Sequence, residues 1–185
     1  PQTNTPADRA NVQIVSGEFF TVLRQQAQAG RLLQPSDNET PGAHRVAVIS
    51  EEFWERHFHR SPPAVGRPMI INGYTFTIVG VAGPEFFGPI VAITNPDVWI
   101  PVMMQHEARY ASNARNSDTA DPRKPWATQD SIEWLSAIVR VRNEAEAGQV
   151  AALLTLQYQR ENLGRLENGS AEERSAIERQ RVELA

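Results

Sequence analysis

Short runs in which apolar residues alternate with polar ones occur between residues 12 and 101, and they predict β-strands. The predicted strands are Val12–Ile14, Arg45–Ile49, Arg67–Ile71, Tyr74–Ala82 and Asp97–Ile100. Asn72-Gly73 separates the third strand from the fourth, and this pair predicts a two-residue hairpin turn because both residues tolerate positive φ. Since both faces of 74–82 are largely apolar, we expect this strand at the centre of a sheet.

Serines that precede aromatic residues predict two helix starts in the same region. Ser16 is expected to cap a short helix that runs through Leu23. Ser50 precedes two glutamates and is expected to cap a second helix, which the Ser61-Pro62-Pro63 stretch would end. A third short helix is predicted over 102–110, and loops over 34–43 and 83–95.

The pattern changes after residue 110. Residues 111–129 are polar and carry two prolines, so they predict a long loop. Strand-like alternation follows over 132–141, and apolar residues at helical spacing predict a helix over 144–166. Ser170, with acidic residues at 172 and 173, predicts another helix start. A final strand is predicted over 181–184, and the polar residues 1–9 are expected to be a loose lead-in.

Composition narrows the class of protein. The chain has 185 residues, a net charge of −4 and no cysteine. The absence of cysteine excludes disulfides, thiolate metal sites and cysteine nucleophiles. The arginines are scattered, which argues against nucleic acid as a partner. No apolar run reaches the roughly 18–20 residues that cross a bilayer. The chain starts at Pro1 without a signal peptide, and we expect it to be a fragment of a larger protein.

The titratable residues show no catalytic or metal-binding pattern. His57 and His59 are two residues apart and would point away from each other on a helix, while His44 and His106 lie far along the chain. Asp97, at a strand start, is expected to cap a turn. The glycines form no phosphate-binding motif. No catalytic residue, metal ligand or cofactor-binding residue is therefore predicted, and no cofactor is expected.

Phe86-Phe87 is the one candidate binding feature of the sequence, because two aromatic residues stand in a predicted loop. Two interpretations are open. The pair folds back onto the core, or it forms an exposed apolar tip for a protein partner.

A series of short motifs resembles one known family. Val15–Phe20 is similar to its "V-S-G-x-Y/F-F" motif, and Gly30-Arg31 to the "G-R" that follows. Further matches in order and spacing are Val46–Ser50 with Trp54 and Phe58, Val65–Arg67, Asn72-Gly73, Phe76–Val81 and Asp97–Pro101. The series resembles the periplasmic core domain of MacB-type ABC transporter permeases, and its duplicated-permease branch in particular. The resemblance is strong over 12–105 and weaker over 131–160.

The resemblance implies an α+β fold with two subdomains. Residues 10–110 would form a β-rich sabre-like subdomain and 111–130 a junction loop. Residues 131–185 would be the second half of a porter-like βα subdomain, whose first half would precede residue 1. The implied partners are the rest of the permease with its transmembrane helices, a second permease copy or half, a cytoplasmic ATPase subunit and a periplasmic adaptor.

The implied function is non-catalytic. The domain would couple the cytoplasmic ATPase cycle to export or to partner binding in the periplasm, and ATP hydrolysis would occur in a separate subunit. Macrolides, peptides and lipoproteins are substrates of better-known members, and the sequence does not choose among them. Two alternatives remain open: a hydrolase that uses His44, His57 or Asp97, and a carbohydrate- or ligand-binding module. The second would require Trp54, Trp99, Trp126 and Trp134 to line one exposed groove.

Overall fold

The computed structural model describes residues 9–89, 95–110, 115–116, 121, 124–129, 132–166 and 169–184. It divides the chain into two compact units, 1–138 and 139–185. The predicted lead-in 1–9 and the loops 83–95 and 111–129 lie partly or largely outside the described residues.

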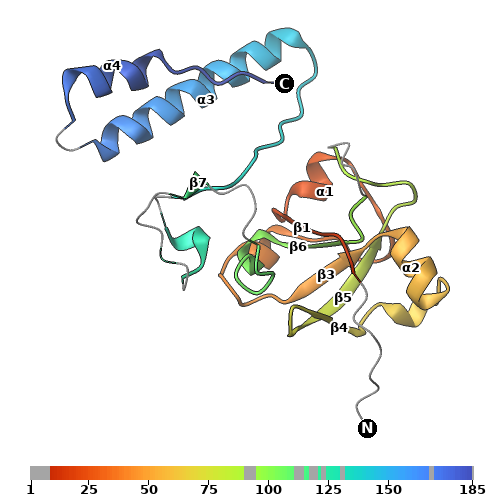
Figure 1. Cartoon of the computed structure of the whole chain (residues 1–185). Helices are drawn as coiled ribbons and strands as arrows, with labels where there is room; N and C mark the ends of the chain where they lie inside the picture. The colour runs from red at the N-terminus through yellow and green to blue at the C-terminus, as the bar shows by residue number, and fades with distance from the viewer. Residues whose placement is uncertain are drawn as a thin grey trace. The chain divides into compact units, whose positions relative to one another are not determined.

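A mixed six-stranded sheet forms the first unit (Figure 1). Its strands are β1 (Val12–Val15), β2 (Ala27–Gly30), β3 (Val46–Ile49), β4 (Pro68–Ile71), β5 (Tyr74–Ala82) and β6 (Val98–Pro101). The order is β1-β6-β3-β5-β2, and β4 also pairs with β5. The β1–β6 and β3–β5 pairs are parallel, whereas the other pairs are antiparallel. These strands and helices confirm the α+β class.

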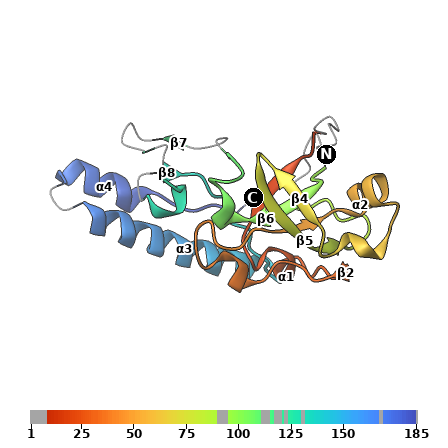
Figure 2. The same cartoon turned by 90° about the horizontal axis from the view of Figure 1, so that it is seen from below.

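The central position predicted for 74–82 is confirmed, because β5 pairs with β3, β2 and β4. The hairpin is confirmed as well, and Figure 2 shows β4 and β5 side by side. Asn72 and Gly73 have φ values of 51° and 91°, the left-handed region that the turn requires. β2 was not predicted, because its Ala-Gln-Ala-Gly sequence lacks β-branched and aromatic residues.

Two helices cover opposite faces of this sheet. Helix α2 (Glu51–Phe58) begins at Ser50, whose hydroxyl accepts the Phe53 N–H at 3.1 Å, as predicted. Helix α1 (Phe19–Val22) begins later than predicted. Glu18 is its N-cap and no side chain caps it, so the expected role of Ser16 is wrong. Ser16 instead contributes its carbonyl oxygen, which accepts the Phe19 N–H at 3.2 Å.

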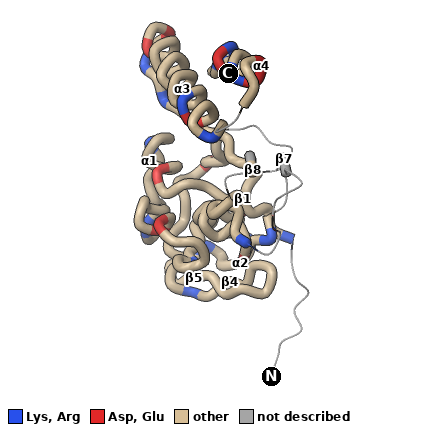
Figure 3. Tube along the Cα trace, turned by 90° about the vertical axis from the view of Figure 1, so that its left-hand side faces the viewer, with Lys and Arg blue, Asp and Glu red and all other residues tan. Residues whose placement is uncertain are grey.

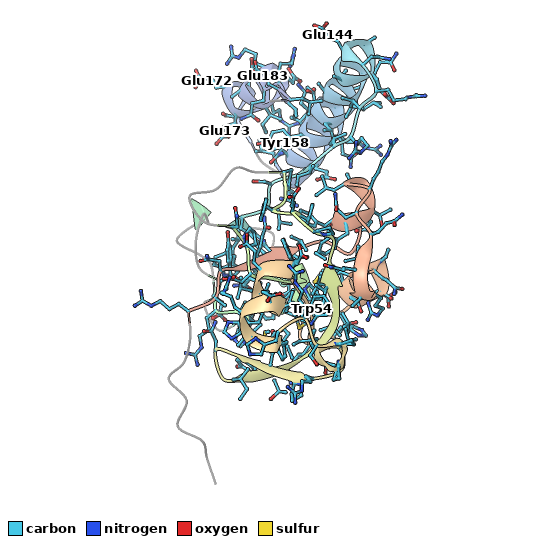
Figure 4. The ribbon with its side chains drawn as sticks, turned by 90° about the vertical axis from the view of Figure 1, so that its right-hand side faces the viewer. Trp54, Glu144, Tyr158, Glu172, Glu173 and Glu183 are labelled. Atoms are coloured by element: carbon cyan, nitrogen blue, oxygen red, sulfur yellow. The ribbon has the colours of Figure 1, made fainter. Side chains whose placement is uncertain are left out.

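Each helix defines one core. Phe53 and Trp54 of α2 pack with buried residues of β3, β5 and β6, and Figure 4 shows Trp54 inside this unit. Phe19 and Phe20 of α1 pack on the other face against Trp99, which is fully buried. Burial on both faces explains why β3 and β6 are almost wholly apolar.

The predicted helix over 102–110 is wrong beyond its first turn. The 3₁₀ turn η3 (Val102–Met104) is followed by further turns, and Arg109 has φ of +51°, which an α-helix does not allow. Two more 3₁₀ turns, η1 (Pro35–Asn38) and η2 (Pro62–Ala64), lie within the loops of this unit, and η4 (Trp126–Thr128) follows later.

The predicted strand 132–141 is present only at its start. The two-residue strand β8 (Ile132–Glu133) pairs with β7 (Arg115–Asn116), and residues 134–141 form no regular element.

The second unit is a helical hairpin. Helix α3 (Glu144–Arg165) is capped by Asn143, and helix α4 (Ala171–Arg179) by Ser170, which forms a capping box with Glu173. Both helices were predicted. The predicted strand 181–184 is wrong, because the Val182 N–H donates to the Thr155 hydroxyl at 2.9 Å rather than to a strand.

Charges of both signs are scattered over the described chain, and Figure 3 shows no one-signed stripe. Among the described residues, no helix combines the length and the apolar character needed to cross a bilayer.

Candidate functional site: the loop after strand β5

The loop after β5 carries Phe86 and Phe87 and begins with a turn at Pro84 and Glu85. Glu85 and Gly88 both have positive φ, at 56° and 86°, so the aromatic pair lies between two residues in the left-handed region. The Phe86 N–H donates to the Gly83 carbonyl at 3.4 Å. This geometry gives the two neighbouring rings different environments.

Phe86 packs into the core that α1 covers. Its ring centroid lies 5.4 Å from that of Trp99, 5.5 Å from Phe20 and 6.1 Å from Phe19. These separations are those of attractive aromatic pairs. Phe86 therefore anchors the loop on the sheet.

Phe87 is the accessible member of the pair, with 36% of its surface exposed. An aromatic ring on an anchored loop can be buried by a partner with little loss of conformational entropy. The two interpretations of the pair thus apply to different residues. Phe86 has the core position, and Phe87 has the position from which a partner can be reached.

Trp99 packs against Phe86 of this loop and is itself held by a hydrogen bond. Its indole N–H donates to Gln13 Oε1 at 2.9 Å, which links β6 to β1. Gly88 lies beside the same Gln13 oxygen and the Phe19 ring, since a Cβ at Gly88 would be 3.8 Å from each. Strand β1, strand β6 and helix α1 together hold the loop.

Asp97 connects helix α2 to the segment that precedes strand β1. One carboxylate oxygen pairs with Arg56 of α2, and the other accepts the Asn11 N–H at 2.9 Å. Asp97 is buried, so these bonds satisfy a carboxylate that would otherwise be costly to bury. The predicted turn-capping role is wrong, because both partners of the carboxylate are distant in sequence: Asn11 lies 86 residues away and Arg56 41 residues away.

A second buried carboxylate organises the turn after β2. Asp37 accepts two hydrogen bonds from the Arg31 guanidinium, at 2.7 and 2.9 Å, and one from the Gln34 N–H at 2.9 Å. Burial acts to raise the pKa of Asp37, but these three hydrogen bonds outweigh it, and the pKa lies below its usual value. This pair holds η1 in place.

The other proposed site residues do not come together. His44 and His57 are exposed. Within the part of the chain that the structure describes, no three His, Asp or Glu side chains are grouped so that they could hold a metal ion. Trp54, Trp99 and Trp126 are buried and Trp134 is half-buried, so core packing accounts for the tryptophans. The tryptophans therefore do not line one exposed groove, as the ligand-binding alternative would require.

One surface was missed at the sequence level. Leu153 and Leu156 of α3 are exposed, although the predicted apolar face of this helix was Ala147, Val150, Ala151, Leu154 and Tyr158. The spacing of Leu153 and Leu156 was available as a signal, but sequence alone does not show which side of a helix α4 covers.

Comparisons with known proteins place the chain in a family. The model of the MacB-like periplasmic core domain matches residues 2–156. A search of curated proteins finds no match. The chain is similar to the crystal structure of the periplasmic region of MacB from Actinobacillus actinomycetemcomitans, at 16% identity and a TM-score of 0.49 over 88% of this chain.

A second similar structure is the extracellular domain of the noncanonic ABC-type transporter YknZ from Gram-positive bacteria. Its identity is 16% and its TM-score 0.43 over 54% of this chain. The chain spans 47% of the YknZ structure and 67% of the MacB structure. Because the family model matches most of its length, the chain belongs to the MacB-like periplasmic core domain family, the extracytoplasmic domains of ABC transporter permeases.

Proposed function

We propose that this domain is a non-catalytic coupling element. It would transmit the ATPase cycle of a cytoplasmic subunit to substrate export or to partner binding on the periplasmic side. The observation that carries the proposal is the family match over residues 2–156. The use of Asp97 as a structural ion-pair partner, with exposed His44 and His57, also supports a role without catalysis.

Coupling requires a body that moves as a whole, and the packing of both faces of the sheet in the first unit supports this role. Its sheet is buried on both faces, and hydrogen bonds and ion pairs join elements distant in sequence, such as Asp97 to Arg56 and Trp99 to Gln13. A force applied at one edge of such a sheet is carried by many packed contacts rather than absorbed by one loop.

We further propose the sabre and porter assignment for the two parts of the chain. Residues 10–110 would be the sabre-like body and 111–130 the junction. Residues 131–185 would be the second half of the porter-like subdomain, whose first half would precede residue 1. The transmembrane helices, a second permease copy or half, the ATPase subunit and a periplasmic adaptor would be the partners.

Phe87 is the residue we assign to partner contact, with Phe86 as its anchor. A photo-activatable benzophenone amino acid placed at position 87 of the full-length permease should cross-link to a second extracytoplasmic protein or permease half in intact cells. The product would be identified by mass spectrometry. The contact is expected because the ring is accessible and its loop is held by the core.

The matched control is the same amino acid at Ile70, which is more exposed than Phe87, at 73%, but lies on strand β4. Selective cross-linking at position 87 supports the assignment. Equal products at both positions, or none at 87, would remove Phe87 from the partner surface.

A further inference from the structure

Strand β1 is the last strand at one end of the six-stranded sheet, and only one of its two edges has a partner. It pairs with β6 in a regular parallel register over all four residues, and no other strand of the described chain pairs with it (Figure 1). Val12, Gln13 and Ile14 are half-buried, whereas every residue of β6 is buried. The outer edge of β1 is therefore open.

The peptide groups of alternate residues in a strand point to opposite edges, which shows which groups of β1 face outward. The Asn11 carbonyl oxygen accepts the N–H of the first residue of β6 at 3.2 Å, so it points toward β6. Gln13 and Val15 follow at a spacing of two residues and also face β6. Val12 and Ile14 point the other way, and among the described residues neither has a backbone hydrogen-bond partner outside the β1–β6 pair. Their N–H and carbonyl groups are thus available at the open edge.

Strands β4 and β2 also pair on one side only, but both carry features that discourage the addition of another strand. β4 begins with Pro68, which supplies no N–H. β2 has an irregular register between Ala27 and Ala29 and ends at Gly30, whose φ is 66°. β1 has no proline, no charged residue and no irregularity in its register. A regular, uncharged edge of this kind is a template for a further strand.

The surroundings of β1 favour an added segment with apolar side chains. On the face of the sheet that α2 covers, Val12 and Ile14 are half-buried against the core. On the other face the loop of Phe87 borders the strand, since a Cβ at Gly88 would lie 3.8 Å from Gln13 Oε1. The side chains of an added strand would alternate between these two faces and extend both of them. The open edge is therefore continuous with the partner surface assigned to Phe87.

We propose that the outer edge of β1 binds an extended, uncharged segment of an extracytoplasmic protein other than this chain by β-strand addition. The peptide groups of Val12 and Ile14 pair with the backbone of that segment, and Phe87 contacts a side chain beside it. In this binding mode the backbone hydrogen bonds supply affinity and the alternate side chains supply specificity. The binding mode rests on the proposed partner contact only for the role of Phe87.

Proline substitutions first test the direction of the peptide groups in the 185-residue chain. Val12→Pro and Ile14→Pro each remove an outward N–H, which an edge strand tolerates, whereas Gln13→Pro removes an inward N–H that bonds to β6. Each variant is compared with the alanine variant at the same position, which keeps the N–H. Only Gln13→Pro should lower the denaturant midpoint, followed by tryptophan fluorescence, well below that of its alanine control. Equally large losses at all three positions would overturn the assignment of the open edge.

The binding test uses the full-length permease in intact cells, with a benzophenone amino acid at Ser16, which is exposed and directly follows β1. Mass spectrometry should place the cross-link in an uncharged segment of another protein with apolar residues at alternate positions. The product should fall several-fold with Ile14→Pro or Val12→Pro and persist with Ile14→Ala or Val12→Ala.

Such a product supports strand addition even where position 87 gives none, a result that would strike only the assignment of Phe87. Three results would overturn the proposal: no product at position 16, a product that neither proline variant reduces, or a product formed with a second copy of this chain.

Discussion

Trp99→Ala is expected to cost about 3–5 kcal/mol of the free energy of unfolding of the first unit. Trp99 is fully buried, and its ring contacts Phe20 and Phe86. Truncation leaves a large cavity beneath the loop after β5 and removes the donor to Gln13. All four tryptophans lie in the first unit, so the fluorescence of the remaining three follows its denaturant-induced unfolding.

The matched control is Trp134→Ala, the same change at a half-buried ring. It is expected to cost about 1 kcal/mol, since less apolar surface is lost. Equal losses for the two variants would contradict the central position of Trp99 in the core.

Gly80→Ala is expected to cost roughly 3 kcal/mol or more, or to prevent folding. A Cβ at Gly80 would lie 2.0 Å from the Arg31 carbonyl oxygen and 2.8 Å from the Arg31 nitrogen. These are backbone atoms beside the β2–β5 pair, where Gly80 faces Gly30, so no side chain can move aside. Denaturant unfolding followed by fluorescence measures the loss.

Gly148→Ala is the control for the same added methyl group. Gly148 lies inside α3 with no atom within 4 Å of its ideal Cβ. Alanine there is expected to stabilise the helix by about 0.5–1 kcal/mol, seen as a higher melting temperature by circular dichroism at 222 nm. The tryptophan-detected transition should stay unchanged. A stable Gly80→Ala variant would show that β2 does not pack against β5 as described.

The parts of the fold that follow from sequence are those set by local signals. The Asn72-Gly73 turn, the Ser50 cap and the helix after Asn143 each depend on residues within a few positions of one another. The order of the strands has no such signal. Strand β1 pairs with β6 across more than eighty residues, and β2 lacks residues that favour strands.

The candidate site was only half predictable for a similar reason. Sequence placed Phe86 and Phe87 in a loop but could not say which ring would meet the core. That choice depends on Phe20 and Trp99, which arrive from α1 and β6. The partners of Asp97 and the exposed side of α3 likewise depend on contacts between distant segments. Ser16 failed as a cap because the helix begins only after the turn at Gly17 and Glu18.

The most direct test of coupling is the reactivity of an introduced cysteine in the full-length permease, reconstituted with its ATPase subunit in lipid nanodiscs. Phe87→Cys lies in the proposed partner loop, and Thr75→Cys lies in the sheet as a control. The rate of maleimide modification at position 87 should differ several-fold between the nucleotide-free and ATP-vanadate states, while the rate at position 75 stays the same. Equal rates at position 87 in both states would contradict the coupling role.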